Sequence, residues 1–143
     1  MIVSEFEYKR PTIEVGWKEE VKVQITSQIV KQFAEMSGDF NPIHMDENYA
    51  KSTKFGGRIA HGMISAAFIS RALNEKVGQG GIYLGQSLKF VHPVFIDDTI
   101  TIELEVTHLR KERGVAMLST NVKNQKNEYC VKGEATIMFE APK

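Results

Sequence analysis

Residues 37–44 form the most informative segment of the chain and read Ser37-Gly38-Asp39-Phe40-Asn41-Pro42-Ile43-His44. Gly38 can adopt a positive φ and end a helix, while Pro42 fixes its own φ and favours extended backbone at the preceding residue. Asp39 and His44 would not share a face of a regular helix or strand, but a bent loop can bring them to one pocket. A carboxylate and an imidazole in such a pocket can hold and activate a water molecule. The segment therefore predicts an enzyme with Asp39 and His44 as its catalytic pair.

The same residues also have an ordinary structural interpretation. Ser-Gly-Asp and Asn-Pro are common in turns, because Asp and Asn side chains bond to nearby backbone groups. Taken alone, an Asp and a His in one loop are most often turn residues. The surrounding sequence decides between the two interpretations.

The longer run from Phe33 to His44, followed after five intervening residues by Ala50, resembles the hydratase-2 signature of the MaoC-like, (R)-specific enoyl-CoA hydratases. Met36 departs from that signature, since its position usually holds a smaller or branched apolar residue. Two further blocks resemble the same family in the same order. They are Ile59-Ala60-His61-Gly62-Met63 with Ser70, and Ile82–Phe90 followed by Pro93-Val94-Phe95. The resemblance extends from about residue 13 to residue 139, nearly the whole chain.

The resemblance implies an activity and a set of roles. The activity is reversible syn hydration of a trans-2-enoyl-CoA to an (R)-3-hydroxyacyl-CoA by the Asp39/His44 pair. The N–H of Gly62 would bind the thioester carbonyl, which agrees with the positive end of a helix dipole stabilising a developing oxyanion. Ser70, rather than Ser65, would orient the catalytic carboxylate.

The remaining polar residues near these motifs are expected to serve the structure. Asn41 is expected to brace the loop backbone, and His61 to cap or pack at a helix start. His92 and His108 are expected to be structural. His44 and His61 lack metal-ligand spacing to other soft ligands, so no metal site is predicted. No Gly-rich phosphate motif follows a strand, so no cofactor is expected.

Two other functions remain open from the sequence. A hotdog acyl-CoA thioesterase would use the same acyl-CoA tunnel with a lone carboxylate, and would not need the Asp39/His44 spacing. A non-catalytic acyl-CoA-binding or regulatory protein could keep the fold without the chemistry. An acyl carrier protein thioester could also replace acyl-CoA as the substrate, because both carry the pantetheine arm.

Composition limits the partners of the chain. The 143 residues are expected to form a single domain spanning 1–143, with residues 1–12 as an N-terminal extension. Lys plus Arg and Asp plus Glu are 18 each, so no basic field is available for nucleic acid. A polyanion such as coenzyme A would need a local cluster, and the candidates are Lys51, Lys54, Arg58 and Lys89. For each of them a solvated surface charge is the more common interpretation.

Cysteine content and hydropathy predict the compartment. The one cysteine, Cys130, permits no internal disulfide and is typical of a reducing compartment. No run approaches the length of a membrane span, and the first seven residues are too short and acidic for a signal peptide. The sequence therefore predicts a cytoplasmic protein with no membrane partner.

Hydrophobic periodicity predicts an α+β fold. Residues 21–25 alternate as a strand, and a helix follows from a Thr26 cap to Gly38. Residues 61–77 predict a helix that is apolar almost all round and so buried on most sides. Residues 99–108, 115–122 and 128–139 alternate as strands of an antiparallel meander. Together with the motifs, this resembles the hotdog fold, in which a curved sheet wraps a long central helix. Such proteins usually form homodimers or higher homo-oligomers.

Overall fold

A computed structural model describes residues 11–78 and 80–139. The expected N-terminal extension therefore lies outside the described residues except for positions 11 and 12. The described chain contains a five-stranded antiparallel sheet in the order β1-β3-β4-β5-β2. The strands are β1 (Lys18–Gln24), β2 (Ile82–Phe90), β3 (Thr99–Arg110), β4 (Val115–Lys123) and β5 (Tyr129–Met138).

The predicted meander is confirmed for β3, β4 and β5, which pair consecutively. Every second residue of β4 is buried, as strict alternation requires. The β3–β4 connection is a short 3-10 turn closed by Gly114, whose φ of 65° suits a residue without a side chain. The other two strands form the edges of the sheet, with β1 beside β3 and β2 beside β5.

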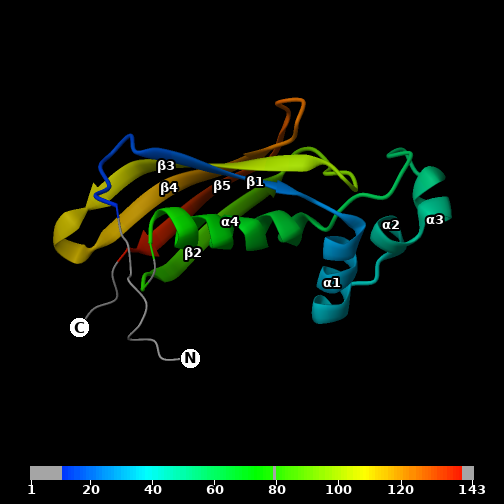
Figure 1. Ribbon diagram of the computed structural model, residues 1–143, viewed down its shortest axis with the longest axis horizontal. Helices are drawn as coiled ribbons and strands as arrows, with labels where there is room; N and C mark the ends of the chain where they lie inside the picture. The colour runs from blue at the N-terminus through cyan, green and yellow to red at the C-terminus, as the bar shows by residue number, and fades with distance from the viewer. Residues whose placement is uncertain (1–10, 79, 140–143) are drawn as a thin grey trace.

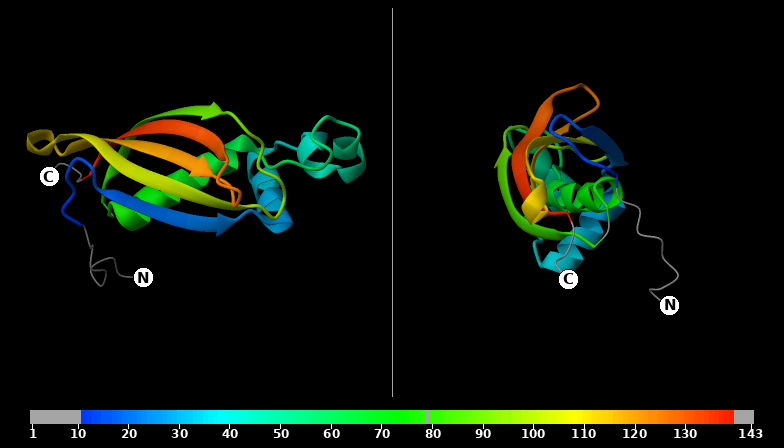
Figure 2. Two further views of the ribbon diagram at one scale, coloured as in Figure 1. Left: turned by 90° about the horizontal axis from the view of Figure 1, so that it is seen from above. Right: turned by 90° about the vertical axis from the view of Figure 1, so that its left-hand side faces the viewer.

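Helix α4 (Gly62–Lys76) lies against the concave face of the sheet, which curls around it (Figures 1 and 2). Its buried residues are Ile64, Ser65, Ile69, Ala72 and Leu73. The α+β arrangement predicted from the sequence is therefore confirmed. The expectation that this helix is buried on most sides is wrong for a single chain, because Met63 is 53% exposed and Ser70 is also exposed. One curved sheet covers one side of a helix and leaves the other side open.

Three short helices extend beyond one end of the sheet (Figure 1): α1 (Ser27–Ser37), α2 (Pro42–Met45) and α3 (Glu47–Lys51). The expected caps are present. The Thr26 hydroxyl accepts the N–H of Ile29, and Gly38 ends α1 with a φ of 80°. Helix α2 was not expected, and it is capped by Asn41, whose side chain accepts the N–H of Ile43.

The described helices are short. Helix α4, with 15 residues, is the longest of them. In the part of the chain that the structure describes, we find no helix with the length and apolar character needed to cross a membrane.

Candidate active site

Asp39 is held by hydrogen bonds from three directions. Its N–H donates to Ser37 Oγ at 3.1 Å, and its Oδ1 accepts the N–H of Asn41 at 3.1 Å. Its backbone carbonyl lies 2.9 Å from Nε2 of His61. The loop therefore fixes both the backbone and one carboxylate oxygen, while the side chain remains exposed to solvent. An ionised carboxylate with one oxygen bound in this way still has a second oxygen with which to accept a proton.

His44 is oriented by a neighbouring segment, residues 58–61. Its Nδ1 lies 2.7 Å from the carbonyl oxygen of Ile59, which assigns the proton to Nδ1 and the lone pair to Nε2. Arg58 Nε donates to the backbone carbonyl of His44 at 2.6 Å. Burial lowers the pKa of His44, and nearby His61 and Arg58 lower it further. The Ile59 carbonyl and Asp39 raise the pKa, but their effects are outweighed. The ring is therefore kept in its neutral form, with an available lone pair.

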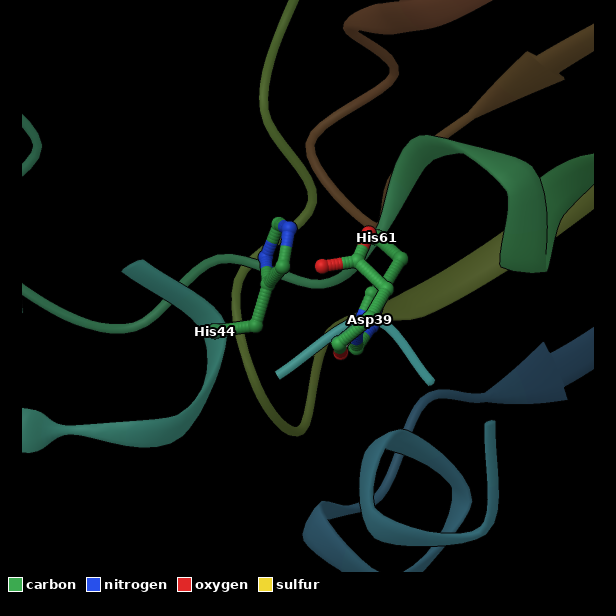
Figure 3. A group of neighbouring side chains, drawn as sticks. All are labelled: Asp39, His44 and His61. Carbon is green, nitrogen blue, oxygen red and sulfur yellow. The ribbon is translucent and has the colours of Figure 1, made fainter. Parts of the chain in front are cut away.

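The loop and the 58–61 segment bring three side chains together (Figure 3). The Asp39 carboxylate is directed towards the ring of His44, and one ligand atom from each of Asp39, His44 and His61 lies within 4.8 Å of the others. The expectation that His44 and His61 lack metal-ligand spacing to other soft ligands is therefore wrong, because the two histidines lie beside each other. One nitrogen of each ring already faces a backbone carbonyl. We interpret the group as an acid/base cluster, and the lack of a metal stays a prediction.

A pocket of about 520 Å³ opens beside this cluster. Its lining includes His44, Lys54, His61, Gly62, Met63, Ser65, Phe90 and His92. Lys54 is the one of the four candidate coenzyme A contacts that lines it. Arg58 instead binds the backbone of His44, so its expected role in binding coenzyme A is not supported.

Gly62 is the first residue of α4 and lies under the ring of Phe90. A Cβ at this position would come within 2.8 Å of Phe90 Cε1, so only glycine fits without displacing the ring. The first N–H groups of any helix lack partners within the helix and point out of its start. Gly62 therefore combines close packing with an N–H at the edge of the pocket.

Ser70 does not lie with Asp39 in one chain. It lines a separate pocket of about 180 Å³ together with residues that include Leu73, Ile82 and Ile137. Nine residues of α-helix place it about 13 Å further along the axis than His61, which contacts Asp39. Ser70 therefore does not orient Asp39 of its own chain, and its expected orienting role stays a prediction. Ser65, which was not expected to orient the carboxylate, is 3% exposed and lines the pocket next to His44.

Comparison with known proteins assigns the family. Residues 9–128 match the MaoC like domain. The chain belongs to the MaoC-like dehydratase family. It is 42% identical over 127 residues to the (R)-specific enoyl-CoA hydratase of Aeromonas caviae, covering 88% of this chain and 95% of that protein. It is 41% identical over 126 residues to the 3-hydroxybutyryl-CoA dehydratase of Methylorubrum extorquens, covering 87% of this chain and 80% of that protein.

Solved structures agree with this MaoC-like assignment. The unliganded R-hydratase from Pseudomonas aeruginosa superposes with a TM-score of 0.86 at 43% identity, covering 91% of this chain and 84% of that chain. The hotdog fold expected from the sequence is thereby confirmed.

Two polar contacts in this MaoC-like site were missed from the sequence. Ser37 accepts the N–H of Asp39 and donates to the Phe33 carbonyl at 2.7 Å, so it joins the end of α1 to the catalytic loop, residues 39–44. The Ser-Gly-Asp sequence contained this signal, since Ser commonly bonds two residues onward in a turn. His92, which was expected to be structural, lines the pocket and lies 3.6 Å from a carboxylate oxygen of Glu128.

Cys130 has no place in the chemistry of the MaoC-like site. Its side chain is buried, and burial raises the pKa of its thiol to about 11. A thiol with such a pKa is protonated near neutrality and is a poor nucleophile. Cys130 is therefore a structural residue.

Arg58→Met is expected to loosen the catalytic loop, because methionine keeps the aliphatic stem but loses the N–H that binds the His44 carbonyl. We expect kcat to fall about tenfold from misplacement of His44. The free energy of unfolding should fall by about 1–2 kcal/mol. Steady-state kinetics and urea unfolding measure both. Lys31→Met, on the exposed side of α1, removes the same charge as a control. Equal effects of the two variants would contradict the role of Arg58.

Proposed function

We propose that this chain is an (R)-specific enoyl-CoA hydratase, formed from one hotdog domain. It would reversibly add water to a trans-2-enoyl thioester to give the (R)-3-hydroxyacyl thioester. The observation that carries the proposal is the Asp39 carboxylate directed at a His44 ring whose Nδ1 is bound to the Ile59 carbonyl, which leaves a lone pair on Nε2. The single cysteine supports a reducing, cytoplasmic location.

The pair can bind one water by both of its hydrogens. The Asp39 carboxylate accepts one hydrogen, and His44 Nε2 accepts the other. As the water oxygen forms a bond to C3 of the substrate, one O–H bond breaks and its proton passes to the base of the pair. The protonated base then delivers a proton to C2 on the same face, so water adds syn and the enzyme returns to its starting state.

The thioester carbonyl must be stabilised while C2 carries negative charge. The N–H at Gly62 supports this role, because it lies at the start of α4 on the pocket lined by His44. Backbone donors aimed at a developing oxyanion need no reorganisation during the reaction. Lys54, on the same lining, is placed to attract the phosphates of coenzyme A.

We infer that the protein acts as a homodimer joined through β2. This strand is an edge of the sheet, and its exposed apolar residues include Ile82, Tyr83, Leu84 and Phe90. An unpaired apolar edge favours pairing with another strand, and a two-fold axis would pair β2 with its own copy in antiparallel fashion.

Such pairing would also complete the site. Antiparallel β2 strands would place the Ile82 end of one copy beside the Phe90 end of the other. Ile82 lines the pocket of Ser70, and Phe90 lines the pocket of His44. Ser70 of one copy would therefore lie near Asp39 and His44 of the other copy. Within one chain, Ser70 does not approach these two residues.

Hydration of crotonyl-CoA tests the proposed function. Loss of absorbance at the enoyl-thioester band, measured in the presence of EDTA, is expected, and chiral analysis is expected to find the (R)-3-hydroxy product. Release of free thiol instead would favour the thioesterase alternative. If neither reaction occurs with an acyl chain of any length, a non-catalytic binding protein is favoured. The same assay with an acyl carrier protein thioester establishes which carrier is preferred.

The pH dependence of kcat/KM is expected to follow the lowered pKa of His44. The neutral ring accepts the water hydrogen, so activity is lost as falling pH protonates it. Because the pKa lies below the ordinary value of 6.5, kcat/KM should begin to fall only below pH 6.5. A pH–rate profile, with NMR titration of His44, checks this. An apparent pKa at or above the ordinary value would contradict it.

Leu84→Glu is expected to separate the proposed dimer, because a buried unpaired charge on β2 opposes strand pairing. Light scattering after gel filtration should give about 32 kDa for the unmodified protein, twice the 16.1 kDa of one chain. The variant should run as a monomer with little activity. Lys22→Glu places the same side chain on the other edge strand, β1, and should leave the dimer intact. A monomeric, fully active unmodified protein would contradict the dimer proposal.

A further inference from the structure

His61 is a buried histidine with an unusual set of contacts. It is 3% exposed and occupies the capping position of α4, but its side chain makes no capping hydrogen bond. Its Nε2 lies 2.9 Å from the backbone carbonyl of Asp39. Its ring centroid lies 3.9 Å from that of His44 and 4.8 Å from that of Phe33. One side chain therefore touches both members of the catalytic pair.

These contacts place a proton on Nε2 of His61. A carbonyl oxygen can only accept, so Nε2 must carry the proton. The other nitrogen, Nδ1, is buried and has no hydrogen-bond partner among the described residues. Protonating Nδ1 would bury an N–H without an acceptor, and a buried unpaired donor costs about 1–3 kcal/mol, more when charged. The neutral form with the proton on Nε2 avoids this cost.

We propose that His61 is a positioning residue for the hydration reaction. Its Nε2–H holds the backbone of Asp39, and its neutral ring covers one face of the His44 ring. The first contact sets where the Asp39 carboxylate is presented. The second keeps water and charge away from His44, so that His44 exchanges a proton only with the water between the pair.

The charged groups around the His44 and His61 rings agree with these two roles of His61. The charged or titratable groups that face His44 are Asp39, Arg58 and His61. Lys54 and His92 contribute from the other parts of the pocket lining. Arg58 is bound to the His44 carbonyl, and a charged His61 would place a second cation directly against the His44 ring. A neutral His61 ring therefore adds no second positive charge beside the His44 ring.

Two substitutions separate the two contacts. His61→Gln keeps an amide N–H close to the position of Nε2 but removes the ring from His44. His61→Phe keeps a ring against His44 but removes the donor to Asp39. A residue that only fills space would respond to size, whereas a positioning residue responds to the group that is lost.

The kinetic readout rests on the proposed function. His61→Phe is expected to lower kcat for crotonyl-CoA hydration about 10–100-fold through misplacement of Asp39. Its KM and the acid limb of kcat/KM should change little. His61→Gln is expected to retain more of kcat, while its acid limb moves up towards the ordinary histidine pKa as water reaches His44. Unchanged kcat in His61→Phe together with an unchanged acid limb in His61→Gln would overturn the proposal.

A measurement on the unmodified protein needs no activity and no variant. Long-range ¹⁵N–¹H NMR spectra of the imidazoles are expected to show a proton on Nε2 of His61. A His61 ring with its proton on Nδ1 and none on Nε2 would overturn the proposal even in an active hydratase. If the protein does not hydrate enoyl thioesters, the proposed function fails, while this spectrum still decides the state of His61. If His61→Phe does not fold, His61→Met removes the same donor with a more adaptable side chain.

Discussion

Asp39→Asn and His44→Gln are each expected to lower kcat for crotonyl-CoA hydration by about 10²–10⁴-fold, the usual cost of losing a positioned acid or base. Asparagine keeps an oxygen that can accept the N–H of Asn41, but it cannot take a proton from water. Glutamine removes the imidazole and its bond to the Ile59 carbonyl. The initial rate of hydration, measured on each variant, gives the effect directly.

A second substitution at His44 separates chemistry from loop geometry. His44→Asn can keep an N–H near the position of Nδ1, which binds the Ile59 carbonyl, while it removes the nitrogen that faces the water. We expect it to be as inactive as His44→Gln but more stable to unfolding. Near wild-type hydration by a folded Asp39 or His44 variant would show that the pair is not catalytic. Loss of hydration with intact thioester cleavage would favour the thioesterase alternative.

Gly62→Val is expected to lower kcat/KM by the equivalent of about 3–4 kcal/mol, the typical cost of one misplaced oxyanion donor. A β-branched side chain at the start of α4 would crowd the thioester carbonyl. Ser65→Ala, one turn along the helix, is expected to have a mild effect. Ser70→Ala is expected to fall between the two, because it would loosen Asp39 in the proposed dimer without removing it.

The contact with Phe90 requires a matched control for the Gly62 experiment. A side chain at Gly62 would also displace the Phe90 ring, whose Cε1 lies 2.8 Å from the point that a Cβ would occupy. The double variant Gly62→Val/Phe90→Leu relieves that clash while the carbonyl remains crowded. We expect it to stay as inactive as Gly62→Val, with folding verified by circular dichroism. Recovery of activity would show that the glycine serves packing and that the oxyanion donor lies elsewhere.

The features predicted well from the sequence are those that neighbouring residues determine. Thr26 and Gly38 delimit α1 because a cap depends on the residues next to it. The strict alternation at residues 99–108 predicted β3 because one face of the sheet meets the core. The bend of the loop at residues 38–42 was also predicted, since Gly38 and Pro42 impose its shape locally, whereas the catalytic role of the loop stays a prediction.

The features missed depend on contacts between distant segments. No local pattern places β2 beside β5, so the open edge of the sheet could not be recognised from residues 82–90 alone. Ser70 has the spacing of the family motif, yet the axial rise of α4 separates it from Asp39 in one chain. His61 was expected only to cap or pack, because its contact with the Asp39 carbonyl spans 22 residues of sequence.

Four hydrogen bonds fasten the catalytic loop, residues 39–44, to residues 58–61. Residues 90–93, which line the pocket, belong to β2 and the chain that follows it, and they take no part in these bonds. Val94 lines the same pocket but accepts the N–H of Ala60 at 2.7 Å, so it is joined to residues 58–61. Redesign of the substrate range can therefore begin at residues 91–93 and leave the alignment of the pair intact, whereas an exchange at Val94 or within residues 58–61 will disturb turnover for every substrate alike.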